Sequence, residues 1–224
     1  MTLRGRKKGE TVPQGVVVRL PVYFRYLAEL EAAGAERISS AQLGEALDFT
    51  AAQIRSDLSY FGSFGQQGYG YNVTDLLDQV KQILGITRDY SIVLVGAGNL
   101  GKAIGSYEWF RDEGFQIKAI FDIDPHLIGN YHVGCIIRPL DELTAYLAEN
   151  PTDIGIIATP KDAGQSVCDL LVEGGVGSIW NFSPTHLNVP DEVIVEDMHL
   201  TDSLLRLVFR LNYDQIIKLV GRRC

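Results

Sequence analysis

Residues 91–101 constrain the fold more than any other stretch, because a short apolar run leads directly into three glycines at fixed spacing. Ile92–Val95 predicts a buried strand, and a Gly-x-Gly-x-x-Gly turn follows it before a helical pattern begins. In a dinucleotide-binding βαβ unit, these glycines permit the turn, the approach of a pyrophosphate and the packing of helix on strand. The phosphates would lie on free N–H groups at the helix start. The residues expected there are Gly96, Ala97, Gly98, Asn99, Leu100 and Gly101.

The pattern downstream extends this prediction to a parallel sheet. Leu100–Phe110 is expected to be helical, and Ile117–Phe121 to form a second strand that ends at Asp122. An acidic residue about twenty positions past the glycines binds the ribose hydroxyls of NAD, and its charge disfavours the 2′-phosphate of NADP. Later strands are expected at 153–158, 178–180 and 192–195, and a helix at 163–173. The strand ends add four expected cofactor contacts, Thr159, Pro160, Asn181 and Phe182.

A plain Rossmann enzyme would usually begin with this first strand, whereas here residues 1–90 precede it. At 224 residues the chain is long enough for two small domains. No apolar run approaches the length of a transmembrane helix, and the basic start lacks the apolar core of a signal peptide. The three cysteines lack metal-ligand spacing, so we expect reduced thiols, no metal site and a cytoplasmic protein.

Charge is unevenly distributed along the chain, whose formal net charge is −8. Residues 1–60 hold 8 Lys/Arg against 7 Asp/Glu, whereas residues 61–224 hold 12 against 21. The segment Arg4–Lys8 is basic. Such an arm either contacts DNA phosphates or remains a solvated tail, and charge alone leaves both interpretations open.

The N-terminal region carries the pattern of a helix-turn-helix. Pro21 predicts a helix start, because proline favours the first helical turn. Two capping boxes follow at 39–42 and 50–53, each a hydroxyl residue three positions before a glutamine. They predict a short helix at 41–47 and a third helix at 51–61, joined by a tight turn.

The third helix has two faces. Ile54, Leu58 and Phe61 recur at i, i+4 and i+7 and are expected in the core. The other face carries polar side chains suited to a major groove, and Arg55 there could bind a guanine edge or a phosphate. An ordinary amphipathic helix with a solvated polar face is the alternative.

Two further segments complete the expected architecture. Gly62–Tyr71 holds four glycines and three aromatics, which favours a β-hairpin wing over a free linker, and Val73–Leu84 predicts a connecting helix. Thr201–Val220 predicts a terminal helix that is apolar on more than one face and must therefore be buried on most sides. We interpret it as a dimerisation helix, which two protomers could exchange; docking across its own sheet is the alternative.

The expected fold class is therefore α/β, with an N-terminal winged helix-turn-helix, a Rossmann-like parallel-sheet domain and a C-terminal dimerisation helix. The corresponding boundaries are 1–85, 86–198 and 199–224. No catalytic constellation is recognisable, since none of the four histidines is paired with an acidic or nucleophilic motif of known spacing. We expect no catalytic residue.

From about Val12 to Tyr213 the chain resembles the Rex family of bacterial redox-sensing transcriptional repressors. The segments that carry the resemblance are Ser39–Gly44, Gln53–Gly62, Gly68–Tyr71, Val95–Gly101, Phe121–Asp124 and Asn181–Pro184. It implies a homodimer whose Rossmann domains bind NADH or NAD+ and whose winged helices bind an inverted-repeat operator. NADH would close the dimer and release the DNA, with no chemistry done on the cofactor.

The resemblance also implies roles for individual residues. Arg55 matches a recognition-helix arginine, while Ser56 stands where many relatives carry a second basic residue. Tyr107 and Phe182 match aromatic residues near the nicotinamide. Arg19 matches an arginine that joins the winged helix to the cofactor domain, and His199 stands where an acidic partner is expected; Asp197 or Asp202 could substitute, or His199 could make the switch sensitive to pH. The residues expected at DNA are Ser40, Gln53, Arg55, Ser56, Ser59, Tyr60, Gln66 and Tyr69.

Three alternatives to a redox-sensing repressor remain open from the sequence. One is an NAD-dependent oxidoreductase with a helical N-terminal domain, which would transfer a hydride to an added carbonyl compound. Another is a winged-helix regulator of a different ligand such as a CoA-type nucleotide. The third is a structural dimer module that does not bind DNA, in which replacing Arg55 would change nothing measurable.

Overall fold

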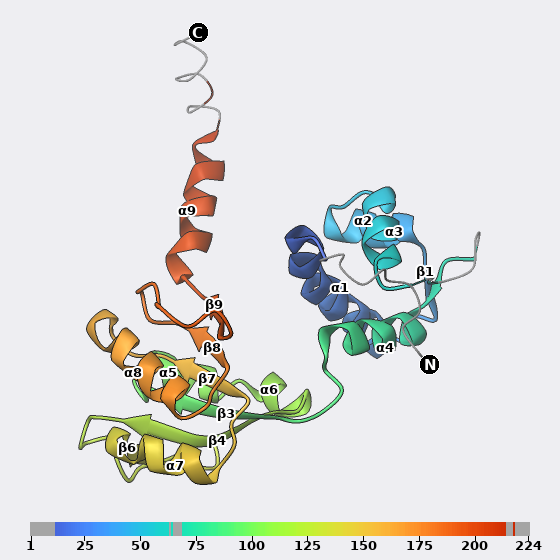
Figure 1. Ribbon diagram of the computed structural model, residues 1–224. Helices are drawn as coiled ribbons and strands as arrows, with labels where there is room; N and C mark the ends of the chain where they lie inside the picture. Colours follow the sequence, from blue (N-terminus) through green and yellow to red (C-terminus); the bar gives the residue numbers. More distant parts are fainter. Residues whose placement is uncertain (1–11, 63, 65–68, 214–216, 218–224) are drawn as a thin grey trace. The chain divides into compact units, whose positions relative to one another are not determined.

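The computed structural model describes residues 12–62, 64, 69–213 and 217, and divides the chain into two compact units, Met1–Arg88 and Asp89–Cys224 (Figure 1). The basic arm Arg4–Lys8, the wing residue Gln66 and most of the chain after Tyr213 lie outside the described residues. Each unit has its own buried apolar core.

The first unit is helical, with one short antiparallel ribbon. Its elements are α1 (Gln14–Ala32), β1 (Arg37–Ile38), α2 (Ser40–Leu47), α3 (Ala51–Ser59), β2 (Tyr71–Asn72) and α4 (Val73–Leu84). Its core is a single cluster centred on Tyr23, Leu27, Leu43, Ile54 and Leu77. Helix α4 matches the expected connecting helix and ends at Gly85 in the left-handed conformation.

The expectation that the first helix starts at Pro21 is wrong. Helix α1 begins at Gln14 and carries Pro21 in its interior, on an exposed position. The reason is tertiary packing, because Val16 and Leu20 are buried on the same face as Tyr23 and extend the apolar stripe ahead of the proline. Burial of this stripe offsets the hydrogen bond that a proline removes from a helix.

Helices α2 and α3 begin at the predicted caps. Ser39 and Gln42 form the full capping box, with Gln42 N donating to Ser39 Oγ at 3.1 Å and Ser39 N donating to Gln42 Oε1 at 2.9 Å. Thr50 makes the first of the two expected bonds, accepting from the backbone N–H of Gln53 at 3.1 Å. Asp48 ends α2 in the left-handed conformation, which turns the chain into α3. Helix α3 ends at Ser59, two residues before the predicted end.

The described end of the expected wing pairs with a strand from earlier in the chain. Strand β2 pairs with β1, which precedes α2, while residues 63 and 65–68 of the expected hairpin lie outside the described residues. Gly70 adopts a φ of +72°, and a Cβ atom there would lie 2.7 Å from the carbonyl oxygen of Ile38. The ribbon therefore closes on a strand that sequence periodicity did not reveal, because β1 has only two residues.

The second unit is a seven-stranded sheet with helices on both faces. Its strands are β3 (Tyr90–Val95), β4 (Phe115–Asp122), β5 (Tyr131–His132), β6 (Cys135–Pro139), β7 (Ile154–Ile157), β8 (Ser178–Asn181) and β9 (Ile194–Asp197). The sheet order is β5-β6-β4-β3-β7-β8-β9, parallel except for β5. Without β5, the order of the six parallel strands is that of a Rossmann dinucleotide fold, with the switch point between β3 and β7.

Two apolar clusters separate the faces of this sheet. Its helical segments are α5 (Asn99–Gly105), α6 (Glu108–Asp112), η1 (Leu140–Glu142), α7 (Leu143–Glu149) and α8 (Lys161–Glu173). Helices α7 and α8 contribute Leu143, Leu147 and Leu171 to the cluster on one face, and α5 contributes Ile104 to the cluster on the other. Each helix therefore buries one apolar stripe against the strands.

The prediction of one helix over Leu100–Phe110 is wrong. The segment forms α5 and α6, separated at Ser106 and Tyr107, and Tyr107 has the extended backbone of an N-cap residue. The Ser106 hydroxyl donates to the carbonyl of Lys102 at 2.8 Å, which satisfies a backbone acceptor at the end of α5. The last strand also starts two residues later than predicted, at Ile194.

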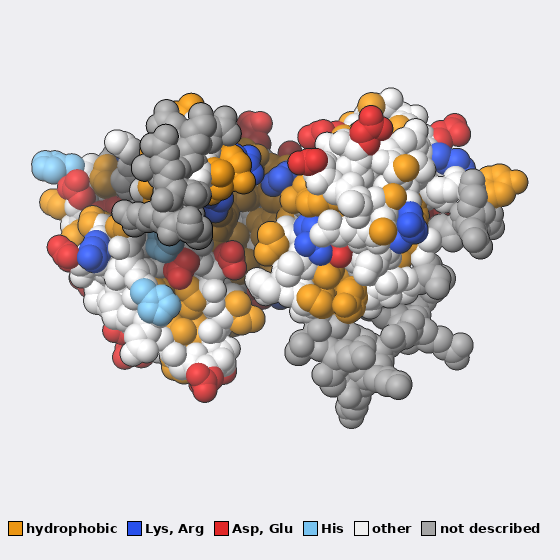
Figure 2. All heavy atoms as spheres, turned by 90° about the horizontal axis from the view of Figure 1, so that it is seen from above, with side chains coloured by type: hydrophobic (Ala, Val, Ile, Leu, Met, Phe, Trp, Pro, Cys, Tyr) orange, Lys and Arg blue, Asp and Glu red, His pale blue; other side chains and the backbone are white. Residues whose placement is uncertain are grey.

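Helix α9 (Leu200–Leu211) follows the last strand and buries none of its residues within the described part of the chain. Its exposed hydrophobic side chains include Leu204 (60%), Leu205 (64%) and Leu211 (80%). Exposed hydrophobic side chains of both units are drawn in orange in Figure 2. Exposed apolar patches of this kind mark a surface that is covered by another molecule or by another part of the same chain. No helix among the described residues is long and apolar enough to cross a membrane.

Candidate nucleotide and DNA sites

The three glycines of the predicted turn have different steric environments. Gly96 adopts a φ of +103°, and a Cβ atom there would lie 2.5 Å from the carbonyl oxygen of Ala158. A Cβ atom on Gly101 would overlap the carbonyl oxygen of Gly96, so this glycine lets α5 approach the turn. Gly98 has no neighbour within 4 Å of its Cβ position. That open side is where a ligand can approach the backbone.

A cavity of about 490 Å³ lies beside this turn, at the carboxyl ends of β3, β4 and β7. The volume and position suit a nucleotide at the switch point of a doubly wound sheet. Predicted cofactor residues that line it are Gly96, Gly98, Asn99, Leu100, Asp122, Thr159, Pro160 and Phe182.

Asp122 and Thr159 are two of the polar residues that line this cavity. The carboxylate of Asp122 accepts from the backbone N–H of Ala97 at 2.5 Å and from that of Asp124 at 2.9 Å, so its orientation is held by backbone donors. The carboxylate oxygens keep further lone pairs for hydroxyl donors. The Oγ1 atom of Thr159 is buried and has no hydrogen-bond partner among the described residues. A buried hydroxyl without a partner is costly, and a ligand atom would satisfy it.

Four predicted cofactor residues do not line the cavity. Ala97 and Gly101 are buried beneath the turn. Asn181 is also buried; its Nδ2 atom donates to the carbonyl of Thr185 at 2.9 Å and to Oδ1 of Asp197 at 2.7 Å. Asn181 therefore orients the segment that carries Phe182.

Tyr107 is 59% exposed and lines a different cavity, beside Phe110 and Arg111. Its ring packs edge-on against Phe110, with 5.2 Å between ring centroids. Its contact with a nicotinamide stays a prediction.

Helix α3 presents the predicted DNA face. Arg55, Ser56, Ser59 and Tyr60 are exposed, and Gln53 is half-buried. The buried residues on the opposite side include the predicted Ile54 and Leu58. The DNA face is therefore free of internal packing.

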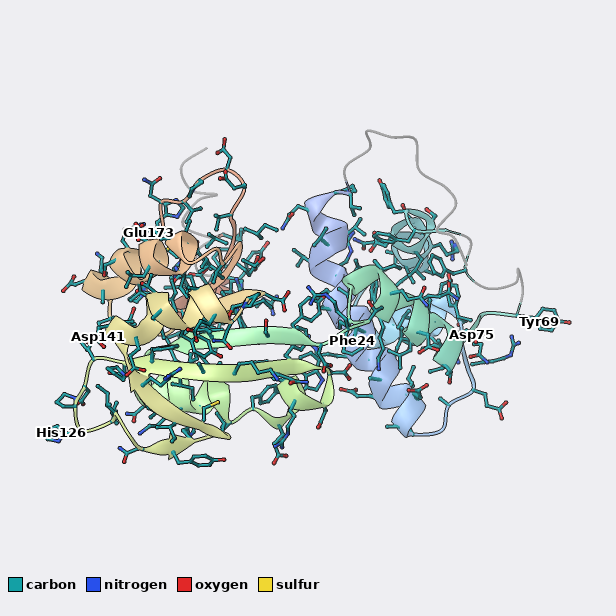
Figure 3. All side chains as sticks on the ribbon, turned by 60° about the horizontal axis from the view of Figure 1, so that its bottom comes forward. Phe24, Tyr69, Asp75, His126, Asp141 and Glu173 are labelled. Atoms are coloured by element: carbon teal, nitrogen blue, oxygen red, sulfur yellow. The ribbon has the colours of Figure 1, made fainter. Side chains whose placement is uncertain are left out.

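Other candidate DNA residues come from neighbouring elements. The Nη1 atom of Arg55 donates to Oγ of Ser40, the first residue of α2, at 3.0 Å. Tyr69 is 72% exposed and extends outward beside β2 (Figure 3). Arg37 donates to its carbonyl at 2.9 Å and lies 5.9 Å from its ring centroid.

Of the two predicted interdomain residues, Arg19 has a partner within its own unit. Arg19 pairs with the buried carboxylate of Asp57 on α3, within the first unit. His199 is the N-cap residue of α9. Asp197, considered as a substitute acid, already accepts from Asn181, and its other oxygen lies 3.9 Å from Nδ1 of His186. The role of Asp197 as a partner of Arg19 stays a prediction.

Sequence reasoning missed Asp57. Burial alone would raise the pKa of its carboxyl, but hydrogen bonds from Arg19 and Tyr23 outweigh this effect and lower the pKa. The same carboxylate and burial raise the pKa of the Tyr23 hydroxyl, with burial the larger cause. The available signal was an acidic residue at i+3 from Ile54, on the apolar side of the helix.

Comparison with known proteins covers both units. Residues 87–185 match a family model described as "CoA binding domain", and residues 11–59 match one described as "Putative DNA-binding protein N-terminus". The redox-sensing transcriptional repressor Rex of Clostridium kluyveri is 52% identical over 205 residues, covering 92% of this chain and 98% of the relative. That of Clostridium beijerinckii is 50% identical over 206 residues, with the same coverage.

Solved structures agree over nearly the whole chain. The crystal structure of RSP in complex with β-NAD+ and operator DNA matches with a TM-score of 0.88 and 45% identity, covering 95% of this chain and 98% of that chain. RSP in complex with β-NADH matches with a TM-score of 0.86 and 42% identity, covering 96% and 100%. By both its sequence and its fold, the chain belongs to the Rex family of redox-sensing transcriptional repressors.

Proposed function

We propose that this chain represses transcription by binding an inverted-repeat operator as a homodimer, and that NADH binding to its second unit releases the DNA. The observation that carries this proposal is one chain with two sites, the glycine-turn cavity at the switch point and the exposed polar face of α3. The chain would do no chemistry on the cofactor, and as a repressor it would work where the DNA is, in the cytoplasm. The relatives named above are transcriptional repressors, and one solved relative holds NAD+ together with operator DNA.

The residues of the cavity fit a dinucleotide. The open side of Gly98 leaves space for a pyrophosphate against the backbone, and Asp122 offers a carboxylate for ribose hydroxyls. Its negative charge opposes a 2′-phosphate and favours NAD(H) over NADP(H). The unpartnered hydroxyl of Thr159 would gain a hydrogen bond from the ligand. When bound, the cofactor supplies only a difference in ring charge and shape between its two redox forms.

The nicotinamide end of the cavity supports discrimination between the two forms. Phe182 lines the cavity, and the centroid of its ring lies 4.6 Å from the ring centroid of Trp180. NAD+ carries a positive ring charge that NADH lacks. Burying a charge in an apolar pocket costs more than burying a neutral ring, so an apolar wall favours NADH. We assign Phe182 to this wall.

The face of α3 fits a major groove. Arg55 can bind a guanine or a phosphate, and the serines beside it can bind bases or phosphates. Ser40 holds the Arg55 guanidinium in the free protein, which reduces the ordering cost of binding. We propose that Tyr69 contacts the DNA backbone from the end of the ribbon, and that Gln66 does so from the segment before it.

Helix α9 supports the homodimer. All of its apolar side chains are exposed within the described part of this chain. A second copy can cover them, and a two-fold dimer also matches an inverted repeat. We propose that α9 is the main dimer contact.

The test measures coupling between the two sites. A fluorescent duplex, selected by the wild-type protein from a random pool, is titrated at fixed salt with NAD+ present, and NADH is then added. A typical allosteric coupling of about 1–3 kcal/mol predicts a roughly 5- to 150-fold loss of DNA affinity, and DNA must weaken NADH binding by the same factor. Arg55→Ala serves as the DNA-contact variant, with NADH affinity as its control.

Other outcomes would point to the alternatives. DNA binding that does not respond to NADH would refute redox sensing and direct attention to another ligand, such as acyl-CoA. Absence of binding to any DNA would refute the repressor. Hydride transfer from NADH to added carbonyl compounds would establish an oxidoreductase instead.

A further inference from the structure

Helix α3 carries a carboxylate on the side that faces its own domain. Asp57 is 3% exposed, and both of its oxygens are occupied. Arg19 donates from Nε to Oδ2 at 2.6 Å and from Nη2 to Oδ1 at 2.7 Å, and the Tyr23 hydroxyl donates to Oδ2 at 2.6 Å. Charged residues are rarely buried unless paired, and this one is paired at both oxygens. All three bonds join α1 to α3.

The same cluster reaches the turn between α2 and α3. The Arg19 guanidinium lies 6.0 Å from the ring centroid of Phe49, and the Tyr23 ring packs edge-on against Phe49 at 5.9 Å. Phe49 lies in the turn between the two helices. One cluster of three polar residues and Phe49 therefore joins α1, the turn and α3.

Stability alone gives a poor account of this arrangement. A buried ion pair contributes little net stability, because desolvation of the charges offsets their attraction. Ile54 and Leu58 already anchor one face of α3 in the core. The hydrophobic effect is not directional, so these contacts do not by themselves fix the rotation of the helix. A two-point bond between a guanidinium and a carboxylate fixes both distance and angle. The network therefore fixes the orientation of α3, a helix of nine residues that has few side chains in the core.

Orientation is the property that base recognition requires. Side chains extend about 5–6 Å from a helix axis, so a rotation of about 10° displaces their atoms by about 1 Å. Hydrogen bonds to base edges tolerate only a few tenths of an ångström, whereas attraction to phosphates is long-ranged. A small rotation of α3 would thus impair contacts made by Arg55 and Ser56 with bases while retaining binding to the backbone.

We propose that Asp57 is a positioning residue that sets the rotation of α3 through Arg19 and Tyr23, and thereby determines operator selectivity. Selectivity here means the ratio of affinities for operator and for unrelated DNA. The inference rests on the proposed DNA-binding function, and it assigns Asp57 no contact with DNA.

The main test removes the network without leaving an unpaired buried group. The triple variant Arg19→Met, Tyr23→Phe, Asp57→Leu replaces all three polar groups with apolar ones, a change that buried ion pairs often tolerate. Affinity is measured by fluorescence anisotropy for the duplex selected by the wild-type protein and for a scrambled duplex of the same composition. We expect a urea midpoint near that of the wild type and a selectivity at least about tenfold lower.

A conservative variant and a matched control complete the design. Arg19→Lys keeps the charge but replaces the two-point bond with a single ammonium contact, so an intermediate loss of selectivity is expected even if the triple variant fails to fold. The control Arg138→Met with Glu142→Leu removes another Arg–carboxylate pair, in the second unit, and should leave selectivity unchanged.

The outcomes separate the inference from the proposed function. If the wild-type protein selects no sequence, the proposed function fails. If it selects one and the folded triple variant keeps the same selectivity, Asp57 has only a structural role and the inference is overturned. The inference would also be overturned if a folded Arg19→Lys variant had the selectivity of the wild type.

Discussion

Two glycines of the same turn should respond in opposite ways to alanine. Gly98 has ordinary backbone angles, with φ −67°, and open space at its Cβ position, whereas a Cβ on Gly101 would overlap the Gly96 carbonyl oxygen. Gly98→Ala should therefore fold with nearly unchanged stability, because a gain of about 0.4–1 kcal/mol from the unfolded chain offsets a weaker N-cap. Gly101→Ala should lose about 1–3 kcal/mol through overpacking.

Although Gly98→Ala should keep its stability, it should bind NADH more weakly than the wild type. Its methyl group would occupy the side from which we expect a pyrophosphate to approach the backbone. Loss of one hydrogen bond to a charged group costs about 1.5–3 kcal/mol, which is roughly a 10- to 100-fold weaker Kd for NADH. Titration calorimetry gives the affinity, and urea unfolding gives the stability.

Gly177→Ala is the matched control, since this glycine has similarly open surroundings and lies away from the cavity. It should change neither stability nor affinity appreciably. Wild-type NADH affinity in Gly98→Ala would refute the assignment of the pyrophosphate to this turn. Wild-type stability in Gly101→Ala would refute the packing argument.

Other predictions address the remaining parts of the molecule. Thr159→Val should leave stability unchanged or slightly higher, because the hydroxyl is unpartnered, and should weaken NADH binding by roughly 2- to 10-fold, the worth of one neutral hydrogen bond, in a calorimetric titration. Arg55→Ala should cost about 1–3 kcal/mol in operator binding if it reads a base, or reduce the salt slope by about one if it binds a phosphate; anisotropy across salt concentrations distinguishes these. Leu204→Asp should convert the dimer to monomer in sedimentation velocity, and a persistent dimer would argue that α9 docks on its own chain. The lowered pKa of Asp57 stabilises the fold at pH values above about 3.9, its value in the unfolded chain, and this contribution is lost as the pH falls through the lower folded pKa. Asp57→Asn should therefore be less stable than wild type near neutral pH, with a difference that shrinks below pH 4 in urea melts; a constant difference would contradict this assignment.

Features that depend on neighbouring residues could be predicted from the sequence. The glycine turn and the capping box of α2 are short patterns whose backbone angles or hydrogen bonds involve residues close in the chain, and the carboxylate at the end of β4 follows the glycines at a characteristic spacing. The amphipathic pattern of α4 likewise gave its bounds, because the 3.6-residue repeat of a helix is visible in the sequence itself. The first three of these features lie in segments that carry the family resemblance, and the turn and the carboxylate line the cavity.

Features that depend on residues far apart in the chain could not be predicted from the sequence. Pro21 lies inside α1 because the core buries residues on both sides of it. Asp57 looks like one more polar residue until α1 places Arg19 and Tyr23 beside it, 38 and 34 residues away in the chain. Sequence alone thus determined the nucleotide turn and the order of the domains, since these follow from local backbone requirements. Tertiary structure decided which polar groups are buried and how the recognition helix is held, since both depend on contacts between residues far apart in the chain.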